Sequence, residues 1–182
     1  MLQQIINLVK ENAGDVINNN PDIPADKKEE AFQVAGSSVA DGLKGVLSHG
    51  GVKDVMKLFS GTSDVSDNPV TQQASGAFVD NLTSKLGLNS SQASGLASSI
   101  IPMVLGKLVN KTNDPNDSSF DLQDMMNQFS GGKTSGMNVG ALLGKFKSGL
   151  DKDGDGDVDL NDLKNMFSGG GSFTDKIKGM FK

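Results

Sequence analysis

The chain has 182 residues, of which 36% are apolar, and a net charge of −5. It has no cysteine, which excludes disulfides, thiolate metal sites and a cysteine nucleophile. All 17 basic residues are lysines, so the arginine contacts typical of nucleic-acid-binding proteins are missing and we expect no nucleic-acid partner.

The N-terminal segment predicts an amphipathic helix. It has no basic region followed by an apolar run and a cleavage site, so we expect no signal peptide and a cytoplasmic location by default, with export by a non-standard route as the alternative. No apolar run approaches the ~20 residues that cross a bilayer, so we expect no membrane span. The apolar residues at helical spacing are Leu2, Ile5, Ile6, Val9, Ala13, Val16 and Ile17, and residues 18–21 (Asn-Asn-Asn-Pro) end the helix.

Five more helices are expected before residue 132, bounded by proline, aspartate or glycine. Pro102 predicts a kink or a split into two helices, because proline removes a backbone donor. Gly36 and its serine neighbours predict a bend in the second helix. Met103, Met125 and Met126 are interpreted as core filler, with an adaptable binding groove as the alternative. The expected helices cover residues 24–49, 52–59, 69–86, 91–109 and 122–129.

One short pattern occurs three times, at residues 52–61, 122–131 and 160–169. Each copy has an aspartate at its third position and ends in Phe-Ser-Gly. The pattern predicts three short helices that end in the same way. In the third copy the shared aspartate, Asp162, is also the last residue of the most specific motif in the chain.

That motif occupies residues 151–162, Asp-Lys-Asp-Gly-Asp-Gly-Asp-Val-Asp-Leu-Asn-Asp. Calcium takes six to eight oxygen ligands, and EF-hand loops supply them from positions 1, 3, 5, 7, 9 and 12, with glycine at position 6. Gly156 falls at the sixth position. The predicted ligands are Asp151, Asp153, Asp155, Asp157 through its carbonyl, Asp159 through water, and Asp162.

Aspartate at the twelfth position departs from the usual glutamate, as in dockerin-type loops. Its side chain is one methylene shorter, so we expect weaker calcium binding, or less discrimination against magnesium. A solvated linker is the alternative reading. It is disfavoured because the acids alternate, glycine holds the sixth position, and helical patterns flank the loop. Residues 114–118 resemble a degenerate second loop, but Met125 at its twelfth position cannot bind a cation.

Residues 87–92 (Gly-Leu-Asn-Ser-Ser-Gln), residues 101–105 (Ile-Pro-Met-Val-Leu) and the Phe-Ser-Gly endings resemble the YidB-like family of bacterial proteins of unknown function. The resemblance covers roughly residues 1–132. It implies an all-helical domain with a homeodomain-like arrangement of helices and no established enzymatic activity. It supplies no catalytic residues.

Together these patterns predict an all-α protein with a YidB-like domain at residues 1–132 and an EF-hand-like unit at residues 133–182. Val139, Leu142, Leu143, Phe146 and Leu150 would form the helix that precedes the ion loop. His49, the sole histidine, is interpreted as a cation at a helix end, since it has no evident nucleophile or acid partner. We expect a calcium-binding protein that is not an enzyme. The alternative is a self-assembling structural protein, a homo-oligomer or filament stabilised by calcium, and either role calls for a protein partner or a second copy.

Overall fold

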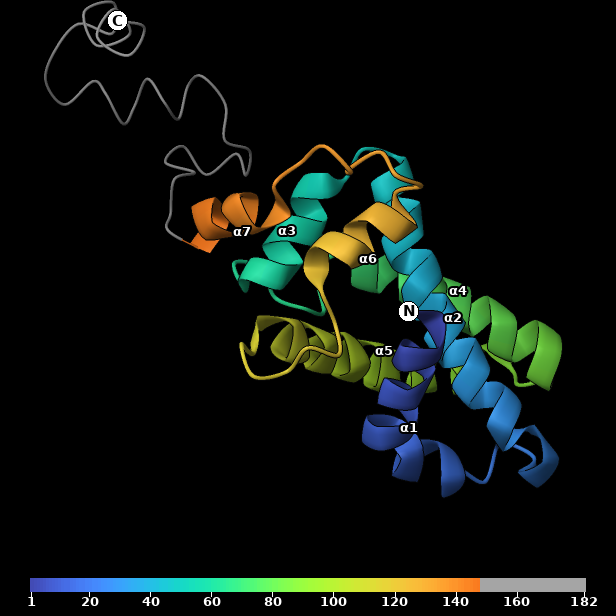
Figure 1. The fold of residues 1–182 in the computed structure, drawn as a ribbon. Helices are drawn as coiled ribbons and strands as arrows, with labels where there is room; N and C mark the ends of the chain where they lie inside the picture. The colour runs from blue at the N-terminus through green and yellow to red at the C-terminus, as the bar shows by residue number, and fades with distance from the viewer. Residues whose placement is uncertain (148–182) are drawn as a thin grey trace, which may run out of the picture.

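The computed structural model describes residues 1–147, and residues 148–182 lie outside the description. The described residues form seven α-helices and one 3-10 turn without any strand, which confirms the all-α class (Figure 1). The elements are α1 (Leu2–Asn18), η1 (Ala25–Lys27), α2 (Lys28–Ser48), α3 (Val52–Ser60), α4 (Pro69–Leu86), α5 (Ser90–Asn113), α6 (Leu122–Phe129) and α7 (Val139–Lys147).

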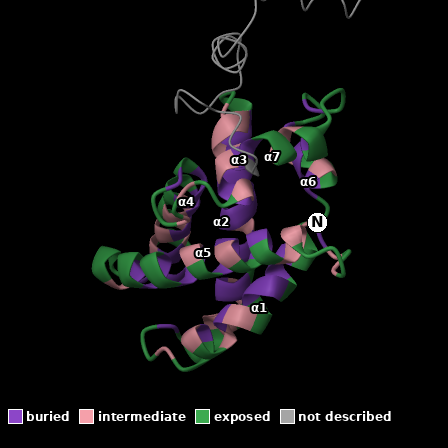
Figure 2. Cartoon of the chain, turned by 90° about the vertical axis from the view of Figure 1, so that its left-hand side faces the viewer, coloured by how far each residue is buried: buried purple, intermediate pink, exposed green. Residues whose placement is uncertain are grey.

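The long helix α2 is the centre of the fold. It packs along α1 and α4, and α5 in turn packs against α4 and α1. The three short helices α3, α6 and α7 gather at the opposite end of the molecule from α1 (Figures 1 and 2). Because α7 packs against both α3 and α6, the helix expected to precede the ion loop belongs to this cluster.

Glycines let the neighbours of α2 approach it closely. A Cβ atom added at Gly36 would lie 2.5 Å from Cγ1 of Ile6 in α1, and one at Gly42 would lie 2.7 Å from Cβ of Ala74 in α4. The bend expected near Gly36 does not interrupt α2, which is one helix from Lys28 to Ser48. The glycine there is explained by the approach of α1.

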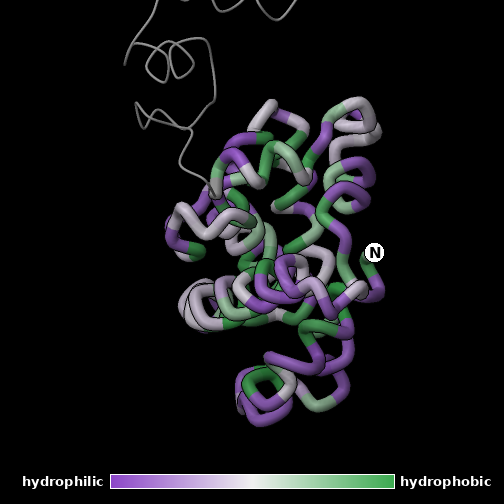
Figure 3. Tube along the Cα trace, turned by 60° about the vertical axis from the view of Figure 1, so that its left-hand side comes forward, coloured by the Kyte–Doolittle hydropathy of each residue, from purple (hydrophilic) through white to green (hydrophobic). Residues whose placement is uncertain are grey.

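Buried positions lie where helices face one another, and the outer sides are exposed and largely hydrophilic (Figures 2 and 3). Met125 and Met126 are buried, so the core-filler interpretation is correct for both, whereas Met103 is on the surface. In α1 the buried face includes Leu8 and leaves Leu2 exposed. This face is wider than the predicted stripe because α1 is covered by both α2 and α5.

Helix α5 is continuous through Pro102, so the predicted split into two helices is wrong. Proline leaves the carbonyl four residues earlier without its usual donor, but that residue, Ser98, is exposed to solvent. Ile100, Ile101 and Val104 are fully buried. Burial on both sides of the proline holds the helix together, because packing overrides local preference.

Among the described helices, α5 alone has the length and composition to cross a membrane. The expectation of no membrane span stays a prediction. Half of its apolar window is buried inside the fold. Such burial is the usual property of a core helix in a globular domain.

The first two copies of the repeated pattern end in the same way. Gly61 after α3 and Gly131 after α6 have φ angles of +73° and +66°, which glycine adopts without strain. In each copy a backbone N–H bonds the carbonyl five residues earlier, from Thr62 to Lys57 (3.2 Å) and from Gly132 to Asn127 (2.8 Å). The predicted helix ends are confirmed for both copies. The third copy lies outside the described residues.

Candidate metal centre

The six predicted ligands, Asp151, Asp153, Asp155, Asp157, Asp159 and Asp162, lie outside the described residues. The structure describes the segment that leads to them, which is α7 and the turn before it. The contacts of that segment show how α7, the helix that leads to the predicted ion loop, is anchored.

Polar contacts fix the start of α7. The N–H of Val139 donates to Oε1 of Gln123 in α6 (3.0 Å), and the N–H of Ala141 donates to Oδ1 of Asn138 (2.9 Å). Asn138 thus acts as an N-terminal cap of the helix. Val139 is fully buried and Phe146 nearly so. Helix α7 is therefore anchored at its first residue and again at its next-to-last residue.

The turn between α6 and α7 is fastened to α6. Thr134 is buried, and its hydroxyl donates to Oδ1 of Asn127 (2.9 Å) and lies 3.1 Å from Oγ of Ser130. The N–H of Thr134 also donates to Oγ of Ser130 (3.2 Å). The domain boundary predicted after residue 132 falls inside this hydrogen-bonded turn.

A groove of about 370 Å³ lies between α3 and α7. Its apolar lining comprises Val52 and Met56 of α3, Met137 of the turn, and Leu142 and Phe146 of α7. Met137 is 42% exposed, and only Leu2 and Met103 are comparably exposed large apolar side chains within residues 1–147. The groove adjoins the helix that leads to the ion loop.

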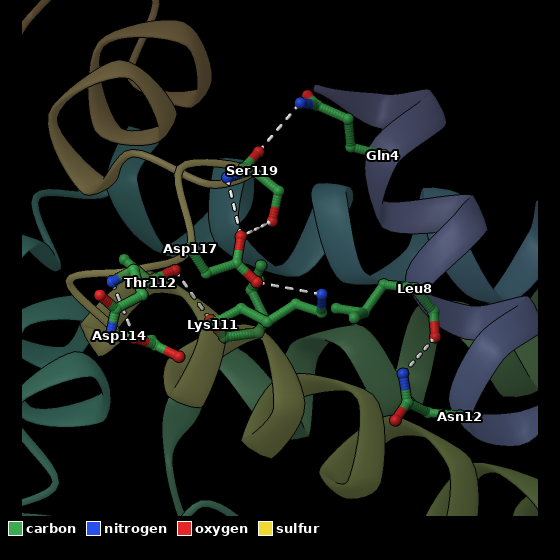
Figure 4. Close-up of polar contacts among 10 residues, drawn as sticks. Gln4, Leu8, Asn12, Lys111, Thr112, Asp114, Asp117 and Ser119 are labelled. Carbon is green, nitrogen blue, oxygen red and sulfur yellow. Dashed lines mark hydrogen bonds and ion pairs between the residues drawn. The ribbon is translucent and has the colours of Figure 1, made fainter.

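The acids of the 114–118 segment are occupied by protein donors (Figure 4). Oδ1 of Asp117 accepts hydrogen bonds from the N–H (2.9 Å) and hydroxyl of Ser119, and Oδ2 pairs with the ammonium of Lys111 (3.1 Å). Gln4 of α1 donates to the Ser119 carbonyl (2.9 Å). The segment therefore closes the end of α5 onto α1 and has a structural role.

The hydroxyl and N–H of Ser119, together with Lys111, lower the pKa of Asp117 to about 2. A carboxyl group whose pKa is lowered by folding stabilises the fold at pH values above its ordinary pKa of 3.8. That stabilisation is lost as the pH falls toward about 2. Asp117→Asn should therefore lower the free energy of unfolding at pH 7.

Urea denaturation across a pH series checks this, with Asp114→Asn as the matched control from the same loop. Asparagine at 114 can keep the hydrogen bond that the Asp114 side chain accepts from the N–H of Asn116 (2.9 Å). The free energy of unfolding of Asp117→Asn should be lower than that of the unmodified chain at pH 5, and this difference should become smaller as the pH falls to 2. A difference that stays constant over this range would show that the charge of Asp117 does not stabilise the fold.

Within residues 1–147, no three histidine, aspartate or glutamate side chains come together as metal ligands would. His49 is exposed at the end of α2, where its Nδ1 lies 2.8 Å from the carbonyl oxygen of Gly45. This agrees with its interpretation as a helix-end residue. The ion loop therefore stays the candidate metal centre on its sequence.

No protein-family model, curated protein or solved structure matches the chain.

Proposed function

We propose that this chain is a non-enzymatic calcium-binding protein in which residues 151–162 hold one ion that orders the helices after it. The single observation that carries the proposal is the spacing of oxygen donors, with acids at positions 1, 3, 5, 9 and 12 and Gly156 at position 6. The carboxylates can converge on a hard cation because the side chains at alternate positions of an EF-hand loop point toward its centre.

The anchoring of α7 supports the proposal. An EF-hand loop lies between two helices, and α7, whose last described residue is four residues before Asp151, is in the place of the first helix. Because α7 is fixed through Val139 and Phe146, one side of the loop starts from a rigid support. Ion binding would then act mainly on the other side, where Asp162 is the third residue of the third copy of the repeat.

The charge of the loop also supports it. Six aspartates and one lysine give the loop the same charge as the whole chain, −5, so the remaining residues are neutral in sum. Five or six carboxylates within twelve residues repel one another unless a cation neutralises them. Divalent calcium relieves this repulsion, and magnesium, with its tighter octahedral shell, is the competing ion.

The resemblance of residues 1–132 to the YidB-like family supports a non-enzymatic role. That family has no established enzymatic activity. Within the described residues, His49, Asp114 and Asp121 lie at helix ends or turns, where their side chains bond to nearby backbone groups. The helical body would then serve as the support of the ion site, and its partner would be a protein or a second copy of the chain.

Calcium titration calorimetry tests the proposal on three proteins. The unmodified chain should bind one ion, and Asp151→Ala/Asp155→Ala should lose the binding heat because two side-chain ligands are removed. Asp157→Asn is the matched control. Position 7 binds through the backbone carbonyl, so this variant should keep binding with weaker affinity. Equal heats from the unmodified chain and the double variant would refute the ion site.

A further inference from the structure

The groove between α3 and α7 is an apolar surface at the point where the described chain ends. It combines residues of the first repeat copy, Val52 and Met56, with Leu142 and Phe146 of α7. Met137 stands at its rim with 42% of its surface exposed. A surface with these side chains would be stabilised by an apolar helix face laid against it.

The third repeat copy has one such face. Its apolar residues are Leu160, Leu163, Met166 and Phe167, spaced so that they share one side of a helix. The corresponding residues of α3 are Val52, Val55, Leu58 and Phe59, and the last three are fully buried.

The fifth position of the repeat distinguishes the third copy from the first two. It is Met56 in the first copy and Met126 in the second, and both are buried. In the third copy it is Lys164. The third copy therefore fits a site that covers it on one side only, as a surface groove does.

Chain connectivity brings the third copy to the groove. Asp151 and Asp162 would bind the same ion, so the helix that follows Asp162 would start beside the end of α7. As a helix, the eight residues 160–167 would be about 12 Å long, close to the roughly 13 Å of the nine-residue α7. The two segments would then match in length and would be joined by the ion loop.

We propose that residues 160–167 dock in the groove between α3 and α7 when calcium fills the loop. The inference rests on the proposed calcium site. Helix α7, which already packs against the first two copies of the repeat, would then contact all three. Ion binding at one end of the chain would then lead to burial of Met137 and Leu142, and it would change the surroundings of Met56, which is already buried.

The occupant is this chain's own segment and not a second copy. A tether of about a dozen residues holds the segment at a millimolar effective concentration near the groove, which a free second copy reaches only in concentrated solution. The docked state should also strengthen calcium binding, because coupling between two sites is reciprocal.

Methionine methyl NMR with added calcium chloride tests the docking on the full chain, with calorimetry on the same samples. The Met137 and Met56 signals should shift with calcium, while Met103, exposed on α5 and outside the groove lining, should not. Phe167→Asn, which leaves every predicted ion ligand in place, should abolish these shifts. It should still bind calcium, with an affinity weakened about fivefold or more. Met137→Gln should weaken calcium binding similarly without disturbing the fold, because Met137 is a surface residue.

The two proposals fail in different ways. Binding heat without a Met137 shift would refute docking and leave the calcium site in place, as would shifts that persist in Phe167→Asn. Shifts that grow with protein concentration would assign the groove to a second copy and refute the intramolecular form. Absence of binding heat would refute both the calcium site and the docking that depends on it.

Discussion

Phe59→Ala is expected to lower the free energy of unfolding by about 3–5 kcal/mol, the usual cost of deleting a buried phenyl ring. Phe59 is fully buried in α3. Its carbonyl accepts a hydrogen bond from Nδ2 of Asn113 at the end of α5 (2.8 Å). Loss of the ring would leave a cavity where α3 meets the rest of the core. Domains of this size are stable by about 5–15 kcal/mol, so the variant would lose a large share of its stability.

The equivalent phenylalanine of the second copy is the matched control. Phe129 is only partly buried, so Phe129→Ala should cost clearly less than Phe59→Ala, because less apolar surface is removed from the core. Urea denaturation of the two variants measures both losses. Equal losses would show that the two repeat copies are packed alike, contrary to the burial described above.

Gly42→Ala is expected to destabilise the chain even though alanine favours helices. The added Cβ would lie 2.8 Å from the carbonyl oxygen of Val70 and 2.9 Å from the N atom of Ala74, both backbone atoms of α4. Helix α4 would have to move away from α2. Such overpacking costs about 1–3 kcal/mol, which outweighs the gain of at most about 1 kcal/mol from replacing glycine in a helix.

Gly76→Ala in α4 is the control and should have the opposite sign. A Cβ at Gly76 meets no atom within 4 Å, so only the helix preference acts, and the free energy of unfolding should rise by about 0.5–1 kcal/mol. Thermal or urea denaturation of the two variants separates the effect of close packing between α2 and α4 on the free energy of unfolding from the effect of helix propensity. If both substitutions stabilise the chain, α2 and α4 do not pack as tightly as described.

Local signals in the sequence predicted most helix boundaries. Asp121 caps α6 by accepting a hydrogen bond from the N–H of Asp124 (2.8 Å), and Asn68 precedes Pro69 at the start of α4. Gly61 and Gly87 end α3 and α4 with positive φ angles. These signals act within a few residues of the chain, which is why the sequence alone reveals them.

The sequence could not show what depends on neighbouring helices. Pro102 predicts a kink or a split, and the split is wrong because burial of Ile101 and Val104 holds α5 together. The sequence did not show that Gly36 lies where Ile6 approaches α2. No short sequence motif specifies which helices pack together, so the roles of Pro102 and Gly36 can be assigned only from the three-dimensional structure.

The candidate site also has one part that the sequence predicts and another that only the structure shows. The spacing of its carboxylates predicts the ion loop, because the proposed ligands are close together in the chain. Gln123 anchors α7 and Asn127 anchors the turn before it, and they lie 16 and 7 residues before their partners, Val139 and Thr134. The groove joins Val52 to Phe146. Contacts of this kind between separate helices have no sequence signature that could have revealed them.

A crystal structure of the chain grown with excess calcium tests the central claim most directly. We predict one ion bound by carboxylate oxygens of Asp151, Asp153, Asp155 and Asp162 and by the carbonyl of Asp157, at about 2.3–2.6 Å. A structure in which residues 151–162 hold no ion, and their carboxylates face only solvent, would contradict it.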